Sequence, residues 1–332
     1  MPFVYTTDKP ANTLTRVERP SRELLPGQVR IRITHCGVCQ SDLSFMQNDY
    51  GDSQYPMIPG HEIVGQVIEC ASGTSHFSIG ERVAVSWQVN SCRTCRCCST
   101  ENEALCPDLK AIAIGEPGGF AEEIVVDQHF VYHLPDNLDS IHAAPLMCAG
   151  STMFNAIKIT QIQSGMRVGV IGIGGLGHLG ILLLKAMGCD VVAFSHTESK
   201  EKDAFKLGAT QFVNCYDKEA IEAAHCDVIL STISQRLDYD TYIKSLNPCG
   251  QFCFVGIPNL PATLDIFPLL IGQKRILASP LGSVKTNQEL IEFAAKHDIK
   301  PWVEILPMSQ INDALDRLAN YQTHYRIVLV NE

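Results

Sequence analysis

The sequence predicts an α/β protein in which a β-rich part is followed by a parallel sheet covered by helices. In the first part of the chain, several short segments alternate apolar and polar residues between turn signals, which is the period of half-buried strands. From Val168 onward, short apolar runs alternate with segments of helical period, which is typical of a doubly wound parallel sheet. With 332 residues, the chain is long enough to form two domains with separate cores.

The strands of the first part can be placed from their alternation. Residues 1–25 predict one or two strands, and the Pro26-Gly27 turn then leads into an alternating segment. The strand candidates that follow this turn are Gln28–Thr34, Ile63–Cys70, Arg82–Val85 and Glu123–Tyr132.

A glycine-rich turn opens the second part. An apolar run ending at Ile171 reads as a buried strand, and leucines with helical spacing follow from Leu179. A strand that turns tightly into a helix presents unpaired backbone N–H groups, so glycines there let a pyrophosphate approach the backbone. The alternative is a tight turn between two core elements. The residues expected to bind a dinucleotide are Gly172, Gly174, Gly175, Leu176 and Gly177.

Strands and helices alternate after this turn. Strands are predicted at Asp190–Phe194, Gln211–Asn214, Val228–Thr232, Gln251–Val255, Arg275–Ser279 and Arg326–Val330. Helices are predicted at Lys218–Ala224, Tyr239–Leu246, Glu289–Lys296 and Ile311–Ala319. This alternation indicates a parallel sheet, and Thr232, at the end of its strand, is assigned to the cofactor site.

The end of the second strand indicates which dinucleotide binds. An NAD site places Asp or Glu about 20 residues beyond the glycines, where it bonds the ribose hydroxyl. This chain has Ser195 and His196 there, with Lys200 close behind. Small donors and a cation suit a 2′-phosphate, so NADP(H) is favoured over NAD(H). The alternative is a capped helix start, with Thr197 or Ser199 as the cap, and both interpretations are compatible.

Fourteen cysteines are present, and four of them have metal-ligand spacing. Cys92, Cys95, Cys98 and Cys106 predict a closed, structural zinc site, because four thiolates complete a tetrahedral shell. Four unconnected buried thiols are the alternative. Cys97 does not fit this spacing and is not predicted to bind the metal, although Cys97 could replace Cys98 as the ligand.

A second set is dispersed along the chain. Cys39, His61 and Cys148 would supply two thiolates and one imidazole, which leaves one of the four positions of zinc open, as in catalytic sites. From spacing alone, Cys36 and Cys39 could instead form a redox pair, and His61 could be an ordinary surface residue.

Composition excludes several classes of protein. A net charge of −10 argues against a nucleic-acid partner. No apolar run approaches the roughly 20 residues needed to cross a bilayer, and the N-terminus lacks the features of a signal peptide. The cysteines therefore fit reduced thiols in the cytoplasm.

Five motifs, in this order, resemble the zinc-containing alcohol dehydrogenases of the medium-chain dehydrogenase superfamily, in particular the cinnamyl alcohol dehydrogenase-like branch. They are Gly-Val-Cys-Gln-Ser-Asp-Leu at 37–43, Pro-Gly-His-Glu-Ile-Val-Gly at 59–65, Pro-Leu-Met-Cys-Ala-Gly at 145–150, Gly-Ile-Gly-Gly-Leu-Gly-His-Leu-Gly at 172–180 and Tyr-Arg-Ile-Val at 325–328. The resemblance implies a GroES-like catalytic domain at 1–148 and 285–332, with a zinc lobe at about 88–108. It implies a Rossmann domain at 149–284.

The resemblance also assigns roles to single residues. It implies that Cys39, His61 and Cys148 bind the catalytic zinc and that the four-cysteine set binds the structural zinc. The further roles it implies are proton transfer by Ser41, orientation of the histidine ligand by Asp42, approach of Glu62 to the metal, contact of Arg326 with the pyrophosphate, and a pocket wall at Trp87. Where much of the branch has histidine three residues after the hydroxyl, this chain has Ser44, so a part for Ser44 in the proton relay stays open.

The sequence therefore predicts an enzyme that transfers a hydride between NADP(H) and a primary alcohol or aldehyde, with two zinc ions per chain. Aldehyde reduction is the expected direction with NADPH. The resemblance further implies a homodimer, with a tetramer left open. The alternatives are a zinc polyol or sugar dehydrogenase and a non-catalytic NADP-binding protein of the same fold.

Overall fold

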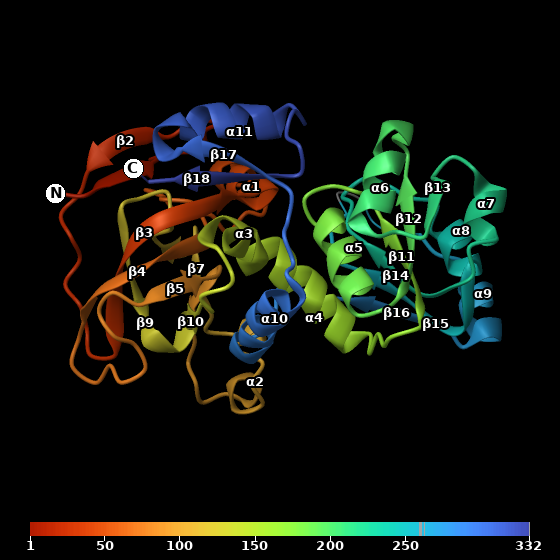
Figure 1. Ribbon diagram of the computed structural model, residues 1–332, viewed down its shortest axis with the longest axis horizontal. Coiled ribbons are helices and arrows are strands. Elements are labelled where there is room, and N and C mark those ends of the chain that lie inside the picture. The colour runs from red at the N-terminus through yellow and green to blue at the C-terminus, as the bar shows by residue number, and fades with distance from the viewer. Residues whose placement is uncertain (259–260, 262, 332) are drawn as a thin grey trace. The chain divides into compact units, whose positions relative to one another are not determined.

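The computed structural model describes residues 1–258, 261 and 263–331, and it divides into two compact units (Figure 1). Unit 1 consists of Met1–Cys148 and Gly282–Glu332, and unit 2 consists of Ala149–Leu281. The second boundary lies three residues before the one expected from the sequence, because Ser283 caps a helix of unit 1.

Unit 1 is built on a sheet with the strand order β10-β5-β4-β3-β18-β17, and β9 pairs with the long strand β3 as well. Only β17 and β18 pair in parallel within the described residues of this sheet. Its strands are β3 (Gln28–Val38), β4 (Glu62–Cys70), β5 (Arg82–Val85), β9 (Glu123–Asp127), β10 (Val131–His133), β17 (Val303–Pro307) and β18 (Arg326–Val330). Smaller sheets hold β1 (Phe3–Thr6), β2 (Thr15–Glu18), β6 (Gln88–Asn90), β7 (Lys110–Ile112) and β8 (Gly115–Glu116).

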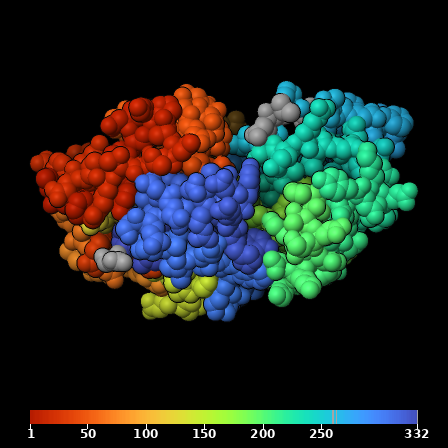
Figure 2. All heavy atoms as spheres, turned by 90° about the horizontal axis from the view of Figure 1, so that it is seen from above, coloured from red at the N-terminus to blue at the C-terminus, as the bar shows by residue number. Residues whose placement is uncertain are grey.

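Unit 1 joins residues from both ends of the chain. β18 pairs with β3, and the side-chain amide of Asn312 bonds both the N–H and the carbonyl of Leu14. Figure 2 shows the C-terminal segment in blue against the N-terminal residues in red. The apolar side of β3 enters a core with Ile327 and Leu329 of β18, which is why the last strand belongs to this unit. The helices of unit 1 are α1 (Gln40–Gln47), α2 (Arg96–Ser99), α3 (Ser140–Pro145), α10 (Val284–His297) and α11 (Ile311–Ala319).

Unit 2 is built on a parallel sheet with the strand order β13-β12-β11-β14-β15-β16. In chain order this is 3-2-1-4-5-6, the arrangement of dinucleotide-binding sheets, whose ligands bind at the carboxyl ends of the strands. The strands are β11 (Arg167–Ile171), β12 (Asp190–Ser195), β13 (Gln211–Asn214), β14 (Cys226–Ser231), β15 (Leu246–Phe254) and β16 (Arg275–Ala278). The predicted doubly wound sheet is therefore confirmed.

Helices cover both faces of the unit 2 sheet, with α5 and α6 on one side and α8 and α9 on the other (Figure 1). Because successive side chains of a strand point to opposite faces, Phe194 of β12 can pack edge-on against Tyr242 of α8, with ring centroids 5.4 Å apart. The helices are α4 (Ser151–Ile159), α5 (Gly177–Ala186), α6 (Glu201–Leu207), α7 (Lys218–Glu222), α8 (Tyr239–Lys244) and α9 (Ile266–Gly272). No helix of the described residues is long and apolar enough to span a membrane.

Several predicted strands differ from the structure in their bounds. The segment predicted at Gln251–Val255, for example, belongs to β15, which begins at Leu246. The segment Glu123–Tyr132 is not one strand, because a short helical turn at Gln128–Phe130 separates β9 from β10. The Asp127 carboxylate accepts a hydrogen bond from the N–H of His129 at 2.9 Å and so starts this turn. The strand predicted at Gln28–Thr34 is longer in the structure. It continues as β3 to Val38, since its last residues pair with both β4 and β18.

Candidate metal and cofactor sites

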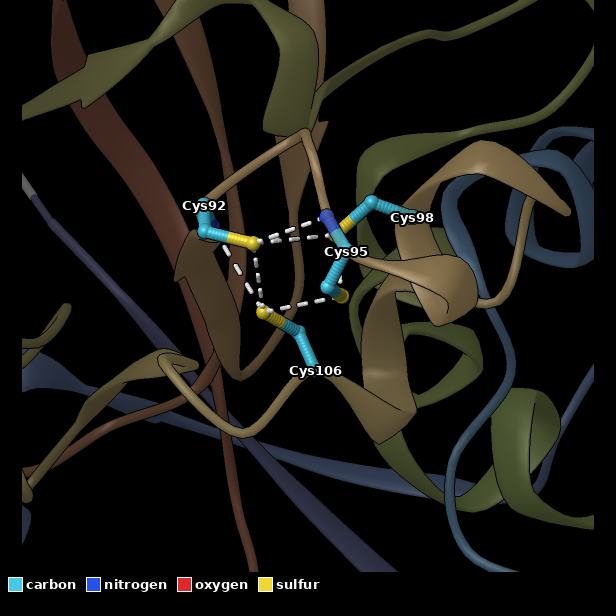
Figure 3. Close-up of side chains that lie close together, drawn as sticks. All are labelled: Cys92, Cys95, Cys98 and Cys106. Atoms are coloured by element: carbon cyan, nitrogen blue, oxygen red, sulfur yellow. Dashed lines mark hydrogen bonds between the residues drawn. The ribbon is translucent and has the colours of Figure 1, made fainter.

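The four regularly spaced cysteines lie together in unit 1 (Figure 3). The sulfur–sulfur distances are 3.5 Å for Cys92–Cys106, 3.6 Å for Cys95–Cys98, and 3.9 Å for both Cys92–Cys98 and Cys95–Cys106. Sulfurs bound about 2.3 Å from a tetrahedral zinc ion are about 3.8 Å apart, so this cluster has the dimensions of a closed zinc–cysteine site.

The loop around this cluster favours a thiolate at Cys92, whereas burial raises the pKa of the Cys106 thiol. Backbone hydrogen bonds from Thr94 and then from Cys95 lower the pKa of the Cys92 thiol to about 6. Cys98 and not Cys97 contributes its sulfur to the cluster, although both lie on α2. The guanidinium of Arg93 forms an ion pair with Asp127, which ties the loop to β9.

The dispersed residues also come together in unit 1. Cys39 precedes α1, His61 directly precedes β4, Glu62 is the first residue of β4, and Cys148 follows α3. Their ligand atoms all lie within 4.8 Å of one another, and all four residues are buried. The sulfurs of Cys39 and Cys148 are 3.8 Å apart, again the separation expected for two thiolates on one zinc ion.

Asp42 of α1 organises this second cluster. Its carboxylate accepts hydrogen bonds of 2.9 Å from the backbone N–H groups of Cys39 and Gly60 and from Nδ1 of His61. With its proton on Nδ1, the imidazole keeps Nε2 available for a metal ion, as histidine ligands commonly do. Burial lowers the pKa of His61, but Asp42 and Cys39 outweigh it and raise that pKa well above its ordinary value. A divalent cation bound here would take the place of the proton that Asp42 and Cys39 favour on the imidazole.

Glu62 forms a buried ion pair with Arg326, the first residue of β18. Burial is the largest cause that raises the pKa of Glu62, to about 7, while Arg326 opposes it. Within the described residues, the second carboxylate oxygen of Glu62 has no hydrogen-bond partner. The structure therefore gives Arg326 a carboxylate partner in unit 1, and its contact with a cofactor pyrophosphate stays a prediction.

Three further predicted residues also lie in unit 1. Ser41 and Ser44 are one turn apart on the half-exposed side of α1, whose other side is buried. Trp87 is half-buried and stacks on Phe45 of α1 with ring centroids 6.5 Å apart. Its indole N–H donates to the carbonyl of Ile112 at 3.1 Å, which fixes the ring orientation.

In unit 2, the glycine-rich turn connects β11 to α5, and each glycine is needed for a different reason. Gly172 has φ +88°, and a Cβ there would lie 2.3 Å from the side chain of Ile233. A Cβ at Gly174 would meet no atom within 4 Å, so the backbone is open to a ligand. A Cβ at Gly177 would lie 1.8 Å from the carbonyl oxygen of Gly172. Gly172 therefore allows the tight turn, Gly174 allows a pyrophosphate to approach the backbone, and Gly177 allows the helix to pack closely on the strand.

The other residues of the turn extend this arrangement. Gly175 and Leu176 directly precede α5, and Leu176 is the N-cap residue of that helix. The hydroxyl of Thr232 donates to the carbonyl groups of Ile171 and Gly172, so it holds the turn against the end of β14.

A cavity of about 410 Å³ opens beside this turn at the carboxyl ends of β12 and β13. Ser195 and His196 line it, as a cofactor site requires. Lys200 does not line it. Its ammonium group donates instead to the carbonyl of Ile173 at 2.6 Å, and burial lowers its pKa.

Two cationic residues that were not predicted from the sequence line this cavity. They are Lys218 and Arg236. Lys218 forms an ion pair of 2.6 Å with Asp238, another lining residue. Arg236 makes no ion pair within the described part of the chain. Both lysine and arginine follow closely after strands, Lys218 after β13 and Arg236 after β14. The rule that ligands bind at the carboxyl ends of parallel strands was the signal that could have identified them.

Comparison with known proteins identifies the family of the chain. Residues 25–136 match the family model of the alcohol dehydrogenase GroES-like domain, and residues 175–296 match that of the zinc-binding dehydrogenases. The chain is 40% identical to the aldehyde reductase AdhA of Synechocystis sp., over 91% of this chain and 90% of that protein. It is 39% identical to a probable mannitol dehydrogenase of Fragaria ananassa, over 93% of this chain and 89% of that protein.

Solved structures give the same result. A cinnamyl alcohol dehydrogenase from Sorghum bicolor has a TM-score of 0.94 and 33% identity, covering 99% of this chain and 97% of that one. CAD from Helicobacter pylori complexed with NADP(H) has a TM-score of 0.91 and 29% identity, with the same coverage. The chain therefore belongs to the zinc-containing alcohol dehydrogenases of the medium-chain dehydrogenase superfamily, in the cinnamyl alcohol dehydrogenase-like branch.

Proposed function

We propose that this alcohol/aldehyde oxidoreductase uses NADP(H) and acts mainly as a reductase of aldehydes, with two zinc ions per chain. The observation that carries the proposal is the buried cluster of Cys39, His61 and Cys148, which offers a zinc ion three ligands and leaves one position for substrate. Family membership and the retained ligands support an enzyme over a non-catalytic NADP-binding protein.

Several residues of the chain have separate roles in the proposed reaction. Bound at the open cluster, a zinc ion would act as a Lewis acid on the substrate oxygen, while a nicotinamide cofactor would carry the hydride. Asp42 holds the ring of His61 in one orientation, and Glu62 provides a buried carboxylate beside the ligand atoms. We assign to Trp87 the role of an aromatic pocket wall and to Ser41 the transfer of the alcohol proton, as the resemblance to the family implies.

A polyol is the second candidate substrate, because three relatives are named mannitol dehydrogenase or probable mannitol dehydrogenase. A panel of aldehydes with NADPH and with NADH, and of alcohols and mannitol with the oxidised cofactors, distinguishes the two. We expect the highest kcat/KM for an aldehyde with NADPH. A higher kcat/KM for mannitol than for any primary alcohol would favour the polyol dehydrogenase instead.

Preference for NADP(H) is supported by the charge around the cavity of unit 2. No carboxylate stands at the end of β12, where Ser195 and His196 line the cavity. The one carboxylate among the lining residues, Asp238, accepts hydrogen bonds from Lys218 and from the hydroxyl of Thr241. Lys218 and Arg236 together add positive charge that suits a phosphate group.

Replacing Ser195 by aspartate is expected to shift the preference towards NADH by at least tenfold in the ratio of kcat/KM values. The new carboxylate would repel a 2′-phosphate and accept the ribose hydroxyl of NADH, and close like charges near a protein surface repel by a few kcal/mol. The measurement is steady-state kinetics with both cofactors and one aldehyde.

The matched control is Ser199→Asp, which adds the same charge at an exposed position that does not line the cavity. Its cofactor ratio should stay close to that of the wild type. A wild-type enzyme that prefers NADH would contradict the assignment of this strand end.

A homodimer is proposed from the surface of unit 2. The apolar side chains of α9 are solvent-exposed, with 65% for Ile266, 66% for Phe267, 71% for Leu270 and 70% for Ile271. β16 is the last strand of its sheet, so one side of its backbone is unpaired. Such a patch marks an interface, and two copies related by a two-fold axis would cover both features.

The double variant Phe267→Glu/Leu270→Glu is therefore expected to be monomeric, because it places charges in the apolar interface. Light scattering after gel filtration should give 36.5 kDa for this variant and twice that mass for the wild type. Ile79→Glu is the control, since Ile79 is 71% exposed but lies in unit 1, and it should remain dimeric. A monomeric wild type at micromolar concentration would refute the dimer, and four times the chain mass would indicate a tetramer.

A reducing, cytoplasmic location is also proposed. None of the fourteen cysteines, all of which lie in the described residues, forms a disulfide, and those of the two clusters must be thiolates to bind metal.

A further inference from the structure

Cys148 lies on an unusual piece of backbone. α3 ends at Pro145, and the next residues, Leu146–Gly150, form a single π-helical turn before α4. Such turns are wider than an α-helix, occur often at functional sites, and do not continue the regular α-helical hydrogen bonds. This turn carries the Cys148 sulfur, so a contact that holds the turn from another element also positions that sulfur.

Ser86 provides a contact of this kind. Its hydroxyl donates a hydrogen bond of 2.5 Å to the carbonyl of Met147, the residue immediately before Cys148. Ser86 is 2% exposed, so water does not replace this bond. The two residues are 61 positions apart in the sequence, and the bond joins the π-helical turn to the end of β5.

The end of β5 belongs to the same rigid framework as another member of the cluster. Val85, beside Ser86, is paired with Ile63 of β4, and His61 and Glu62 lie directly before Ile63. β5 is also paired on its other side with β10, through Val131 opposite Val85. Ser86 thus connects the turn that carries Cys148 to the strand pair that carries His61.

We infer that Ser86 is a positioning residue for Cys148: by holding the Met147 carbonyl against the end of β5, it keeps the Cys148 sulfur in place beside Cys39 and His61. The inference rests on the proposed catalytic zinc site. The separation of 3.8 Å between the sulfurs of Cys39 and Cys148 is already that of a loaded site, so the hydrogen bond of Ser86 pre-organises the ligand set.

The first test is Ser86→Ala, measured by competition of the metal-loaded protein with a chelator and by the absorption spectrum of the cobalt-substituted protein. Outer residues that orient metal ligands typically change metal affinity by about 10- to 100-fold, and we expect a loss of that size at the open site. The thiolate-to-cobalt bands should shift or weaken, while the metal of the four-cysteine cluster is retained.

Ser53→Ala is the matched control. The Ser53 hydroxyl donates to the carbonyl of Phe45 at 2.6 Å, which is a bond of the same kind in the same unit. Both variants lose one hydroxyl–carbonyl bond, so both should lower Tm slightly. Only Ser86→Ala should change the affinity of the open site and the cobalt spectrum.

A second pair keeps the inference testable if Ser86→Ala does not fold. Threonine and valine have nearly the same shape, so Ser86→Thr and Ser86→Val disturb the packing equally and differ in the hydroxyl. The threonine variant should bind metal at the open site at least tenfold more tightly than the valine variant.

Equal affinities within that pair, or a Ser86→Ala protein with wild-type affinity and cobalt spectrum, would overturn the inference. A wild-type protein that binds a single metal ion per chain, and retains it in Cys148→Ser, would refute the proposed catalytic zinc site itself, so the two failures are distinguishable.

Discussion

Replacing Cys148 by serine is expected to abolish turnover of alcohols and aldehydes while the protein stays folded. The open cluster has two thiolates and one imidazole, and serine at neutral pH offers a hydroxyl in place of a thiolate. Serine is close to cysteine in size, so the buried site keeps its packing. The measurements are kcat with an aldehyde and NADPH, metal content, and Tm. One zinc ion per chain should remain, held by the other cluster.

The matched substitution in the closed cluster has a different consequence. Cys95→Ser removes one of four ligands that hold together a loop with little core of its own, and structural zinc sites contribute directly to folding energy. Tm should therefore fall, and this zinc should exchange more readily. A metal-replete, fully active wild-type enzyme with one zinc ion per chain would contradict the assignment of two sites.

The two clusters differ in how far the sequence alone predicts them. The four cysteines are close in the chain, so the spacing Cys-x-x-Cys already brings their sulfurs near one another. The residues of the open cluster come from the start of α1, the start of β4 and the turn after α3. Their proximity depends on the pairing of β3 with β4, a long-range contact that no local pattern specifies. Only the resemblance to a family could assign them.

In the cofactor site, too, the sequence predicts local features better than contacts between distant residues. The glycine-rich turn is local, and the strand and helix on either side of it were predicted from their apolar patterns. Lys200 follows Ser195 closely and is therefore predicted from the sequence to bind the cofactor, but its long side chain reaches the Ile173 carbonyl instead of the cavity. Lys218 and Arg236 line the cavity because parallel strands end at the same edge of the sheet, although these residues are far apart in the sequence.

Boundaries of strands were predicted less well than their existence. Alternation continues through Asp127, which made Glu123–Tyr132 look like one strand, whereas the capping bond of that carboxylate breaks the ladder there. A polar side chain that bonds its own backbone can override a period of two.

The proton path can be tested on α1. An alcohol oxidised in a buried site must pass its hydroxyl proton to water through positioned groups. Ser41 is two residues after Cys39 and lies on the half-exposed side of α1, with Ser44 one turn further along that side. A hydroxyl can accept one proton and donate another, which a relay requires. Histidine could hold the proton near neutral pH, whereas Ser44 carries no charge.

Ser41→Ala is therefore expected to lower kcat by roughly 10²-fold, in line with typical contributions of acid–base catalysis. Ser44→Ala should have a much smaller effect, since water can replace an outer hydroxyl, and it serves as the matched control on the same helix. Where proton release limits turnover, Ser44→His should raise kcat or add a pH dependence near the pKa of histidine. The measurements are pH–rate profiles together with the isotope effect of deuterated alcohol. If Ser41→Ala keeps nearly wild-type kcat while hydride transfer is rate-limiting in both proteins, Ser41 is not the relay and the proton leaves by another route.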